Sequence, residues 1–381
     1  MLTNYQLKIP HAVFAGDEPT SHLRDTVKGV RKAVVFTYAS IVQAGLLAPV
    51  TNILEEQGVS YSVLEDLPLE PTVAQAEAVV RAFRAEKADF IIAIGGGSVM
   101  DIAKLASILD TDAYSIRDLL TDPALGKKTT RTLMIPTTAG TGAEATPNAI
   151  VTVPEKALKV GVVNSDMIAD EVILDAEMIR GLPRPIAAST GIDALAHAIE
   201  CYTSNKANPF SDMFALEAFR LIEQNLEPAC DGDMGAKQRM LLASFYAGVA
   251  ISAAGTTGVH ALSYPLGGRY HIAHGISNAI MLMPVMRFNE PAVRPLFARA
   301  YDCVRPAGGE ATEADKSSWI LSRMEQIVHN VGIPSSLVPY GVSKDDLEDL
   351  VTAGMEVKRL LNNNMRKITA EDARALYREV L

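Results

Sequence analysis

The 381-residue sequence predicts an α/β domain with a parallel sheet over residues 1–180, followed by an all-helical domain over residues 181–381. Two observations support this division. Short apolar runs typical of strands alternate with helical patterns as far as about residue 180. Beyond Leu182-Pro183-Arg184-Pro185 the strand-like runs disappear and amphipathic helical patterns dominate. The chain is long enough for each domain to have its own hydrophobic core.

The expected elements of the first domain follow one another in βαβα order. A candidate edge strand covers 7–14, buried strands are expected at 33–37 and 90–94, further strands at 60–64 and 132–135, and helices at 41–56 and 71–86. This alternation predicts parallel strands with helices on both faces of the sheet. In the second domain, 212–226 and 237–253 have clear helical periodicity.

Composition excludes several classes of function. The formal charge of -10 and the absence of a Lys/Arg-rich block argue against a nucleic-acid surface. The N-terminus lacks a secretory pattern and no apolar run is long enough to span a bilayer, so a cytoplasmic protein is expected. Cys201, Cys230 and Cys303 form no CxxC pair, which argues against a disulfide framework or a thiolate zinc site.

The strongest predicted strand, 90–94, runs directly into Gly95-Gly96-Gly97-Ser98. A strand, a glycine turn and a helix start direct free backbone amides and the positive end of the helix dipole at one point, which suits a diphosphate. Ser98 is expected to cap the helix. The run is not a G-x-G-x-x-G fingerprint, and from the residues alone an ordinary strand-to-helix turn is equally consistent with it.

A second polar loop follows the strand at 132–135. Its small donors are Thr137, Thr138, Thr141 and Thr146, interspersed with two glycines. Such hydroxyls suit ribose and phosphate oxygens, although a threonine-rich turn without a ligand fits the same residues.

A candidate metal site lies in the second domain. Asp193 and His197 are four residues apart in a helical run, so both side chains project from one helix face. His260 and His274 lie among apolar and small residues and could complete a set of one carboxylate and three imidazoles. Such a set suits Fe(II) or Zn(II) better than calcium or magnesium. The alternative is a group of core histidines that bind backbone carbonyls.

Together these motifs resemble the iron-containing (group III) alcohol dehydrogenases over nearly the whole chain. The resemblance also covers Ala188–Ala194 and Asn208–Asp212. It implies a Rossmann-like domain and a helical domain, as in the dehydroquinate-synthase-like fold, and places the four metal ligands at Asp193, His197, His260 and His274. It implies NAD or NADP as cofactor, with contacts from Tyr38, Gly95, Gly96, Gly97, Ser98, Asp101, Thr137, Thr138, Thr141, Thr146, Lys159 and Leu182.

The chain departs from the family pattern at Tyr38 and Tyr264, among other positions. Tyr38 replaces the aspartate that binds the adenosine ribose in members that prefer NAD, so the choice between NAD and NADP stays open, with NAD slightly favoured by family habit. Tyr264 replaces a histidine suspected of relaying the proton. His271 is a candidate replacement, with Tyr264 and water as alternatives. His271 would otherwise be a partner of a metal-bound imidazole.

Arg269 is a third candidate catalytic residue. Its guanidinium would suit an anionic, short-chain substrate, whereas the alternative is an arginine that faces solvent or an interdomain carboxylate.

The predicted function is hydride transfer between the nicotinamide and a metal-bound alcohol or carbonyl, in a cleft between the domains. The substrate would be a small alcohol, aldehyde or ketone, and the family suggests a homodimer. A dehydroquinate-synthase-like or glycerol-dehydrogenase-like enzyme is disfavoured, because the resemblance gives those enzymes fewer imidazole ligands. An inactive cofactor-binding scaffold is the remaining alternative. The sequence does not distinguish iron from zinc.

Overall fold

The computed structural model describes residues 4–156, 158–305 and 311–381. The chain divides into two compact units. The sheet unit comprises Lys8–Thr138 and Gly142–Gly181, and the helical unit comprises Leu182–Leu381 together with Ala139–Thr141 and the N-terminal segment as far as Leu7. The short loop 139–141 therefore belongs to the helical unit, although Thr138 and Gly142 on either side of it belong to the sheet unit.

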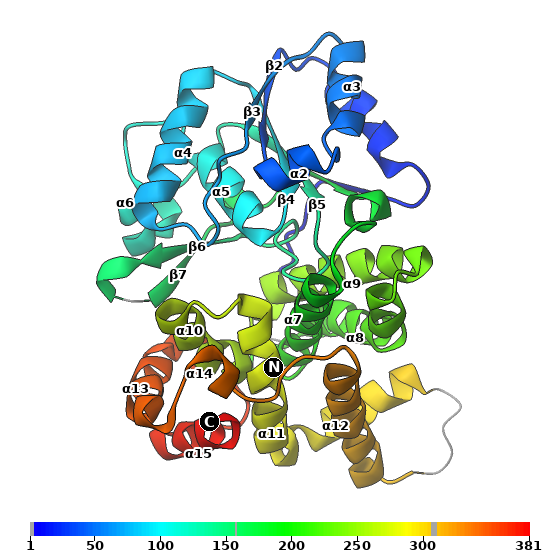
Figure 1. The fold of residues 1–381 in the computed structure, drawn as a ribbon, viewed down its shortest axis with the longest axis vertical. Coiled ribbons are helices and arrows are strands. Elements are labelled where there is room, and N and C mark those ends of the chain that lie inside the picture. Colours follow the sequence, from blue (N-terminus) through cyan, green and yellow to red (C-terminus); the bar gives the residue numbers. More distant parts are fainter. Residues whose placement is uncertain (1–3, 157, 306–310) are drawn as a thin grey trace. The chain divides into compact units, whose positions relative to one another are not determined.

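The sheet unit contains six parallel strands in the order β1-β8-β5-β4-β2-β3 (Figure 1). Their bounds are β1 Ala12–Ala15, β2 Lys32–Phe36, β3 Ser60–Leu64, β4 Phe90–Gly95, β5 Arg131–Pro136 and β8 Glu171–Leu174. All six residues of β4 are buried, as expected of a central parallel strand. The predicted parallel sheet is confirmed. A separate antiparallel ribbon consists of β6 (Asn148–Val153) and β7 (Leu158–Val163).

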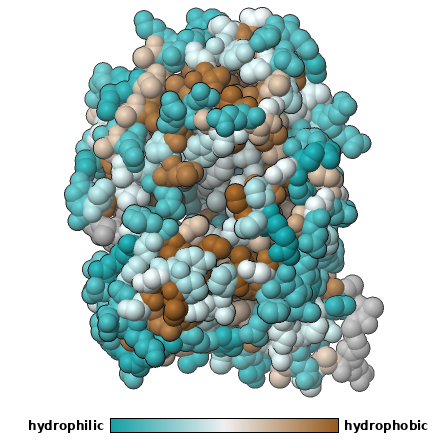
Figure 2. Space-filling view, in the orientation of Figure 1, coloured by the Kyte–Doolittle hydropathy of each residue, from teal (hydrophilic) through white to brown (hydrophobic). Residues whose placement is uncertain are grey.

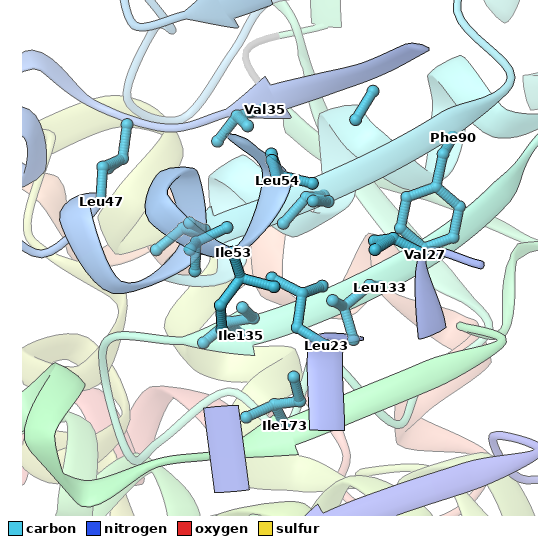
Figure 3. Close-up of a cluster of buried hydrophobic side chains, with 14 of the residues drawn as sticks. Leu23, Val27, Val35, Leu47, Ile53, Leu54, Phe90, Leu133, Ile135 and Ile173 are labelled. Carbon is cyan, nitrogen blue, oxygen red and sulfur yellow. The ribbon is translucent and has the colours of Figure 1, made fainter. Parts of the chain in front are cut away.

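Helices cover both faces of the sheet. On one face, α1 (Leu23–Thr26) and α3 (Ala48–Glu56) contribute Leu23, Ile53 and Leu54 to a cluster of buried side chains (Figure 3). On the other face lie α4 (Val73–Glu86) and α5 (Gly97–Ile108), and Phe83 of α4 packs on Phe36 of β2 with ring centroids 5.8 Å apart. The sheet unit is completed by α2 (Ala39–Gln43) and α6 (Ile116–Thr121).

The helical unit is built around α7. Its helices are α7 Arg184–Tyr202, α8 Pro209–Cys230, α9 Met234–Ala254, α10 Gly258–Tyr270, α11 His274–Val304, α12 Glu313–Asn330, α13 Leu347–Glu356, α14 Lys358–Leu361 and α15 Ala370–Val380. Every residue of α7 from Gly191 to Tyr202 is buried, because α8, α9 and α11 pack around it. Polar side chains in this stretch therefore need partners within the protein.

Several local predictions differ from the structure. The predicted helix 41–56 is two helices, α2 and α3, and the edge strand begins only at Ala12. Helix α5 begins at Gly97 with Gly96 as its N-cap and no side-chain cap, so the expected capping role of Ser98 is wrong. The hydroxyl of Ser98 instead accepts a hydrogen bond from the backbone of Glu70.

The remaining regular elements are short 3-10 helices. They are η1 Pro19–His22, η2 Pro123–Leu125, η3 Pro154–Lys156, η4 Ser165–Met167, η5 Ala176–Ile179, η6 Val338–Tyr340 and η7 Lys344–Asp346. On the face shown in Figure 2, hydrophobic residues gather in separate patches edged by hydrophilic ones. Within the described ranges no single helix is long and apolar enough to cross a membrane; α9 and α10 pass that test only as a pair bent by 105°.

Candidate metal centre and nucleotide loops

The structure brings the four predicted metal ligands together. One ligand atom from each of Asp193, His197, His260 and His274 lies within 4.8 Å of the others. Measured from Oδ1 of Asp193, Nε2 of His197 and of His260 are both 3.7 Å away, and Nε2 of His274 is 3.6 Å away. Asp193, His197 and His260 are buried, whereas the side chain of His274 is 32% exposed.

Close helix packing sets this geometry. Asp193 and His197 lie one turn apart on α7, His260 lies in the first turn of α10, and His274 is the first residue of α11. Gly275 allows α11 to approach α7, since a Cβ at this position would be 2.7 Å from the carbonyl carbon of Ser189. A larger residue would therefore push the start of α11, and His274 with it, away from Asp193.

Two imidazoles are oriented through Nδ1 by groups that were not predicted. Nδ1 of His197 lies 3.2 Å from the carbonyl oxygen of Gly140. Gly140 itself is pressed against α7, because a Cβ there would be 2.6 Å from Cβ of Thr190. Nδ1 of His260 faces a carboxylate oxygen of Glu200. A carboxylate within an otherwise apolar stretch of α7 is the sequence signal that could have identified Glu200.

Asn278 contacts three of the four ligand groups. Its Nδ2 donates to Oδ1 of Asp193 at 2.6 Å and lies 3.0 Å and 3.1 Å from Nε2 of His260 and His274. The hydroxyl of Ser263 donates to the amide oxygen of Asn278. The amide group is therefore held on both sides, and its nitrogen faces the ligands.

Burial and mutual charge shift the pKa values of the ligands. Burial alone would raise the pKa of Asp193, but the three imidazoles and the Asn278 amide outweigh it, so this pKa lies below its ordinary value. Burial lowers the pKa of His197 and favours the neutral ring. Burial would also lower the pKa of His260, but the carboxylates of Glu200 and Asp193 raise it.

This donor set fits a transition metal. Separations of 3.6 to 3.7 Å between Asp193 and the imidazole nitrogens are close to those of ligand atoms about 2.1 Å from a shared centre. Three nitrogens and one oxygen suit Fe(II) or Zn(II), whereas Ca²⁺ and Mg²⁺ require more oxygen ligands.

The glycine and threonine loops are neighbours in the sheet unit. Both follow strands, β4 and β5, which pair in parallel, so their carboxyl ends share one edge of the sheet. The backbone N–H of Thr137 donates to the carbonyl of Gly95 at 3.0 Å. A Cβ on Gly96 would be 3.4 Å from the Thr138 hydroxyl. The amides at the start of α5 and the Thr138 hydroxyl thus form one polar surface.

Tyr38, Ser98 and Lys159 lie around this surface. Tyr38 is the N-cap residue of α2, and burial raises its pKa to about 12, while a hydrogen bond with Ser98 opposes this shift. The backbone N–H of Glu70 donates to the Ser98 hydroxyl at 3.3 Å, and Lys159 Nζ pairs with Oε1 of Glu70 at 2.6 Å. Of these three predicted cofactor contacts, Tyr38 therefore bonds directly to Ser98, and Lys159 is linked to Ser98 through Glu70.

Two other predicted cofactor contacts, Asp101 and Thr146, bond to other residues of the protein. Oδ1 of Asp101 lies 2.9 Å from Nζ of Lys104, and its Oδ2 accepts from the N–H of Ile150 at 3.0 Å. Lys104 is fully buried and also contacts the Thr146 hydroxyl at 3.2 Å. Lys104 was not predicted as a site residue, and here it joins α5 to the threonine loop. Thr141 and Leu182 belong to the helical unit.

The three candidate catalytic residues occupy different surroundings. The ring of Tyr264 lies 6.4 Å from that of His260 and 6.1 Å from that of His274. His271 is exposed and follows α10 in a left-handed conformation, with φ of 54°. Arg269 donates to Asp349 at 2.8 Å, so its charge is paired with a carboxylate of α13. Both residues belong to the helical unit, so this ion pair is not the interdomain pair that the alternative interpretation of Arg269 expects.

A parallel sheet with a glycine turn at one strand end, in the same chain as a helical unit with an Asp/His₃ cluster, defines the class of metal-containing dehydrogenases. Residues 10–176 match the model of the iron-containing alcohol dehydrogenases, and residues 187–381 match the C-terminal model of the Fe-containing alcohol dehydrogenase family. The chain belongs to this family and is an oxidoreductase that acts on CH–OH groups.

Relatives match along nearly the whole chain. Long-chain-alcohol dehydrogenase 1 of Geobacillus thermodenitrificans is 36% identical over 354 residues, which are 92% of this chain and 89% of the relative. Lactaldehyde reductase of Escherichia coli is 33% identical over 362 residues, 93% of this chain and 94% of the relative. The structure of sulfoacetaldehyde reductase from Bifidobacterium kashiwanohense in complex with NAD⁺ aligns with a TM-score of 0.88 at 26% identity, covering 100% of this chain and 99% of that one.

Proposed function

We propose that the chain is a metal-dependent, NAD(P)-linked alcohol dehydrogenase that also works in reverse as an aldehyde or ketone reductase. The observation that carries this proposal is the convergence of Asp193, His197, His260 and His274 within 4.8 Å. Such a centre in an iron-containing alcohol dehydrogenase supports one Fe(II) or Zn(II) per chain. Relatives that act on long-chain alcohols and on lactaldehyde support a primary alcohol or aldehyde as substrate.

Different residues of the chain would bind the metal, bind the cofactor and transfer the proton. When bound, the metal would lower the pKa of a substrate hydroxyl as a Lewis acid, and the nicotinamide would accept the hydride. Asp193 and the three imidazoles would hold the metal, and three of these four residues, Asp193, His197 and His260, are buried. The amides of Gly97 and Ser98 at the start of α5 would bind the cofactor diphosphate. The phenol of Tyr264 would pass on the hydroxyl proton, and the position of its ring 6.4 Å and 6.1 Å from the rings of His260 and His274 supports this role.

NAD is our expected cofactor, and the NAD⁺ complex of a related reductase supports this choice. NADP stays a second candidate because Tyr38 provides no carboxylate to repel a 2′-phosphate.

A homodimer is also expected, with the outer strand β1 as the candidate contact. Light scattering of the purified protein would test the dimer.

A dehydroquinate-synthase-like lyase or a glycerol-dehydrogenase-like enzyme is less consistent with three imidazole ligands.

Anaerobic turnover assays would test the proposal. They would use protein loaded with Fe(II) or Zn(II), NADH and NADPH as cofactors, and neutral and anionic aldehydes as substrates. The Asp193→Asn variant should lose bound metal and turnover, whereas Asp231→Asn, which changes an exposed carboxylate of the same unit, should keep both. Wild-type protein that binds metal and turns over no alcohol or aldehyde would contradict the proposal.

A further inference from the structure

Glu200 is a fully buried carboxylate on α7, three residues after the ligand His197. Its side chain reaches from α7 to the residues at the start of α10. Oε1 accepts hydrogen bonds from the N–H of Thr257 at 3.0 Å, from the Thr257 hydroxyl at 2.7 Å and from the N–H of Val259 at 2.8 Å. Oε2 faces Nδ1 of His260. Both oxygens of this carboxylate are therefore directed at the start of α10.

The contacts of Oε1 fix the position of α10. The first N–H groups of a helix have no partners within the helix, and α10 has no side-chain cap from its own N-cap residue Thr257. Glu200, which lies on α7, accepts hydrogen bonds from these N–H groups and so caps α10. Its negative charge also suits the positive end of the helix dipole. Since His260 lies in this first turn, the same contacts locate its backbone relative to Asp193 and His197.

The contact of Oε2 decides which nitrogen of His260 carries a proton. An ionised carboxylate only accepts hydrogen bonds, so Nδ1 must be the protonated nitrogen. The lone pair of the neutral ring is then on Nε2, the atom that lies 3.7 Å from Oδ1 of Asp193. His197 has a comparable arrangement, but its Nδ1 faces the neutral carbonyl of Gly140. A carboxylate makes the imidazole it contacts a stronger donor to a metal than a carbonyl does.

We propose that Glu200 is a positioning residue of the metal centre, which fixes His260 in the tautomer that presents Nε2 to the metal. The inference rests on the proposed metal centre, because it assumes that His260 is a ligand. It adds that the affinity of this centre depends on a residue that does not itself touch the metal.

The Glu200→Gln variant tests the proposal almost isosterically. The three donors at Oε1 would keep the glutamine oxygen in that position, so the glutamine NH₂ group would face Nδ1 of His260. An NH₂ donor requires an unprotonated Nδ1, which moves the ring proton to Nε2 and removes the lone pair needed by the metal. We expect the affinity for Zn(II), measured by competition with a chromophoric chelator, to fall about 10- to 100-fold.

The matched control is Thr257→Val, which removes the hydroxyl donor to Oε1 and leaves the contact with His260 intact. We expect its Zn(II) affinity to change less than about threefold, because the two backbone N–H donors still hold Oε1 and the lost hydroxyl touches none of the ligands. Equal losses in the two variants would overturn the proposal, since they would reflect loosening of α10. An unchanged affinity in Glu200→Gln would also overturn it.

A second measurement avoids substitution of Glu200. In metal-free wild-type protein labelled with ¹⁵N-histidine, at a pH high enough for the ring of His260 to be neutral, its resonances, assigned with a His260→Asn variant, should show a protonated Nδ1 and an unprotonated Nε2. The opposite tautomer would overturn the proposal even if Glu200→Gln did not fold. Failure of the proposed function would look different: wild-type protein would then bind no stoichiometric Zn(II) or Fe(II) at all.

Discussion

Nε2 of His274, the first residue of α11, lies 3.6 Å from Oδ1 of Asp193 in the middle of α7. This distance depends on how closely the two helices approach, because a Cβ on the next residue, Gly275, would be 2.7 Å from the carbonyl carbon of Ser189. The fourth ligand of the candidate metal centre is thus positioned by the absence of a side chain beside it.

Gly275→Ala should weaken both the fold and the metal centre. We expect a loss of about 1–3 kcal/mol in the free energy of unfolding, because the methyl group overpacks the contact of α11 with α7. Zn(II) affinity should fall as His274 moves from Asp193. Urea unfolding and chelator competition measure the two effects. Gly181→Ala is the control, since a Cβ there meets nothing within 4 Å. Equal affinity in the two variants would show that α11 tolerates the methyl group.

The sequence predicted the elements and residues whose signals are local. The apolar run 90–94 became the buried central strand β4, and the spacing of Asp193 and His197 placed both ligands on one face of α7. The partners of the ligands were not predicted. The Gly140 carbonyl reaches His197 only because loop 139–141 packs with the helical unit, and no periodicity within the loop reveals this. A local pattern reports that a residue is buried, but not which distant group it meets.

Glu144 should make the stability of the protein depend on pH. Burial raises the pKa of this carboxyl from 4.5 to about 7, although its own backbone and Lys104 oppose the shift. Between these values the folded state binds more protons than the unfolded state, so stability falls as pH rises from about 4.5 to about 7. Glu144→Gln cannot ionise, and its advantage over wild type should grow to about 3 kcal/mol above pH 7.

Urea unfolding of both proteins at pH 5 and pH 8 would measure this difference. Glu65→Gln, which changes an exposed glutamate, is the control. If the advantage of Glu144→Gln were the same at both pH values, Glu144 would keep one protonation state in the folded protein, and the prediction would be wrong.

Tyr38→Asp should shift cofactor preference toward NADH. Tyr38 follows strand β2 and contacts Ser98 beside the glycine turn, so a carboxylate here would lie where it can bind ribose hydroxyls and repel a 2′-phosphate. We expect the ratio of kcat/KM for NADH to that for NADPH to rise about tenfold or more. Tyr38→Asn removes the ring without adding charge, and it should leave the ratio nearer to that of wild type. The same shift in both variants would assign the effect to the ring.

Arg269→Ala should affect neutral and anionic aldehydes equally. The guanidinium is 2.8 Å from Oδ2 of Asp349, and an exposed pair of this kind contributes about 1 kcal/mol or less. We expect kcat/KM to change less than about threefold for both classes, and Asp349→Ala should behave alike. A loss confined to anionic aldehydes would show instead that Arg269 recognises substrate charge.

Tyr264→Phe should slow turnover more than His271→Ala. The Tyr264 ring lies 6.1 Å from that of His274, whereas His271 is an exposed residue at the end of α10. If the phenol passes on the substrate proton, removing its hydroxyl should lower kcat about 100-fold with no change in bound metal. His271→Ala should retain most of the turnover. The reverse order, with metal content unchanged in both proteins, would assign proton transfer to His271, because a residue that only supports the fold would alter metal content or stability as well.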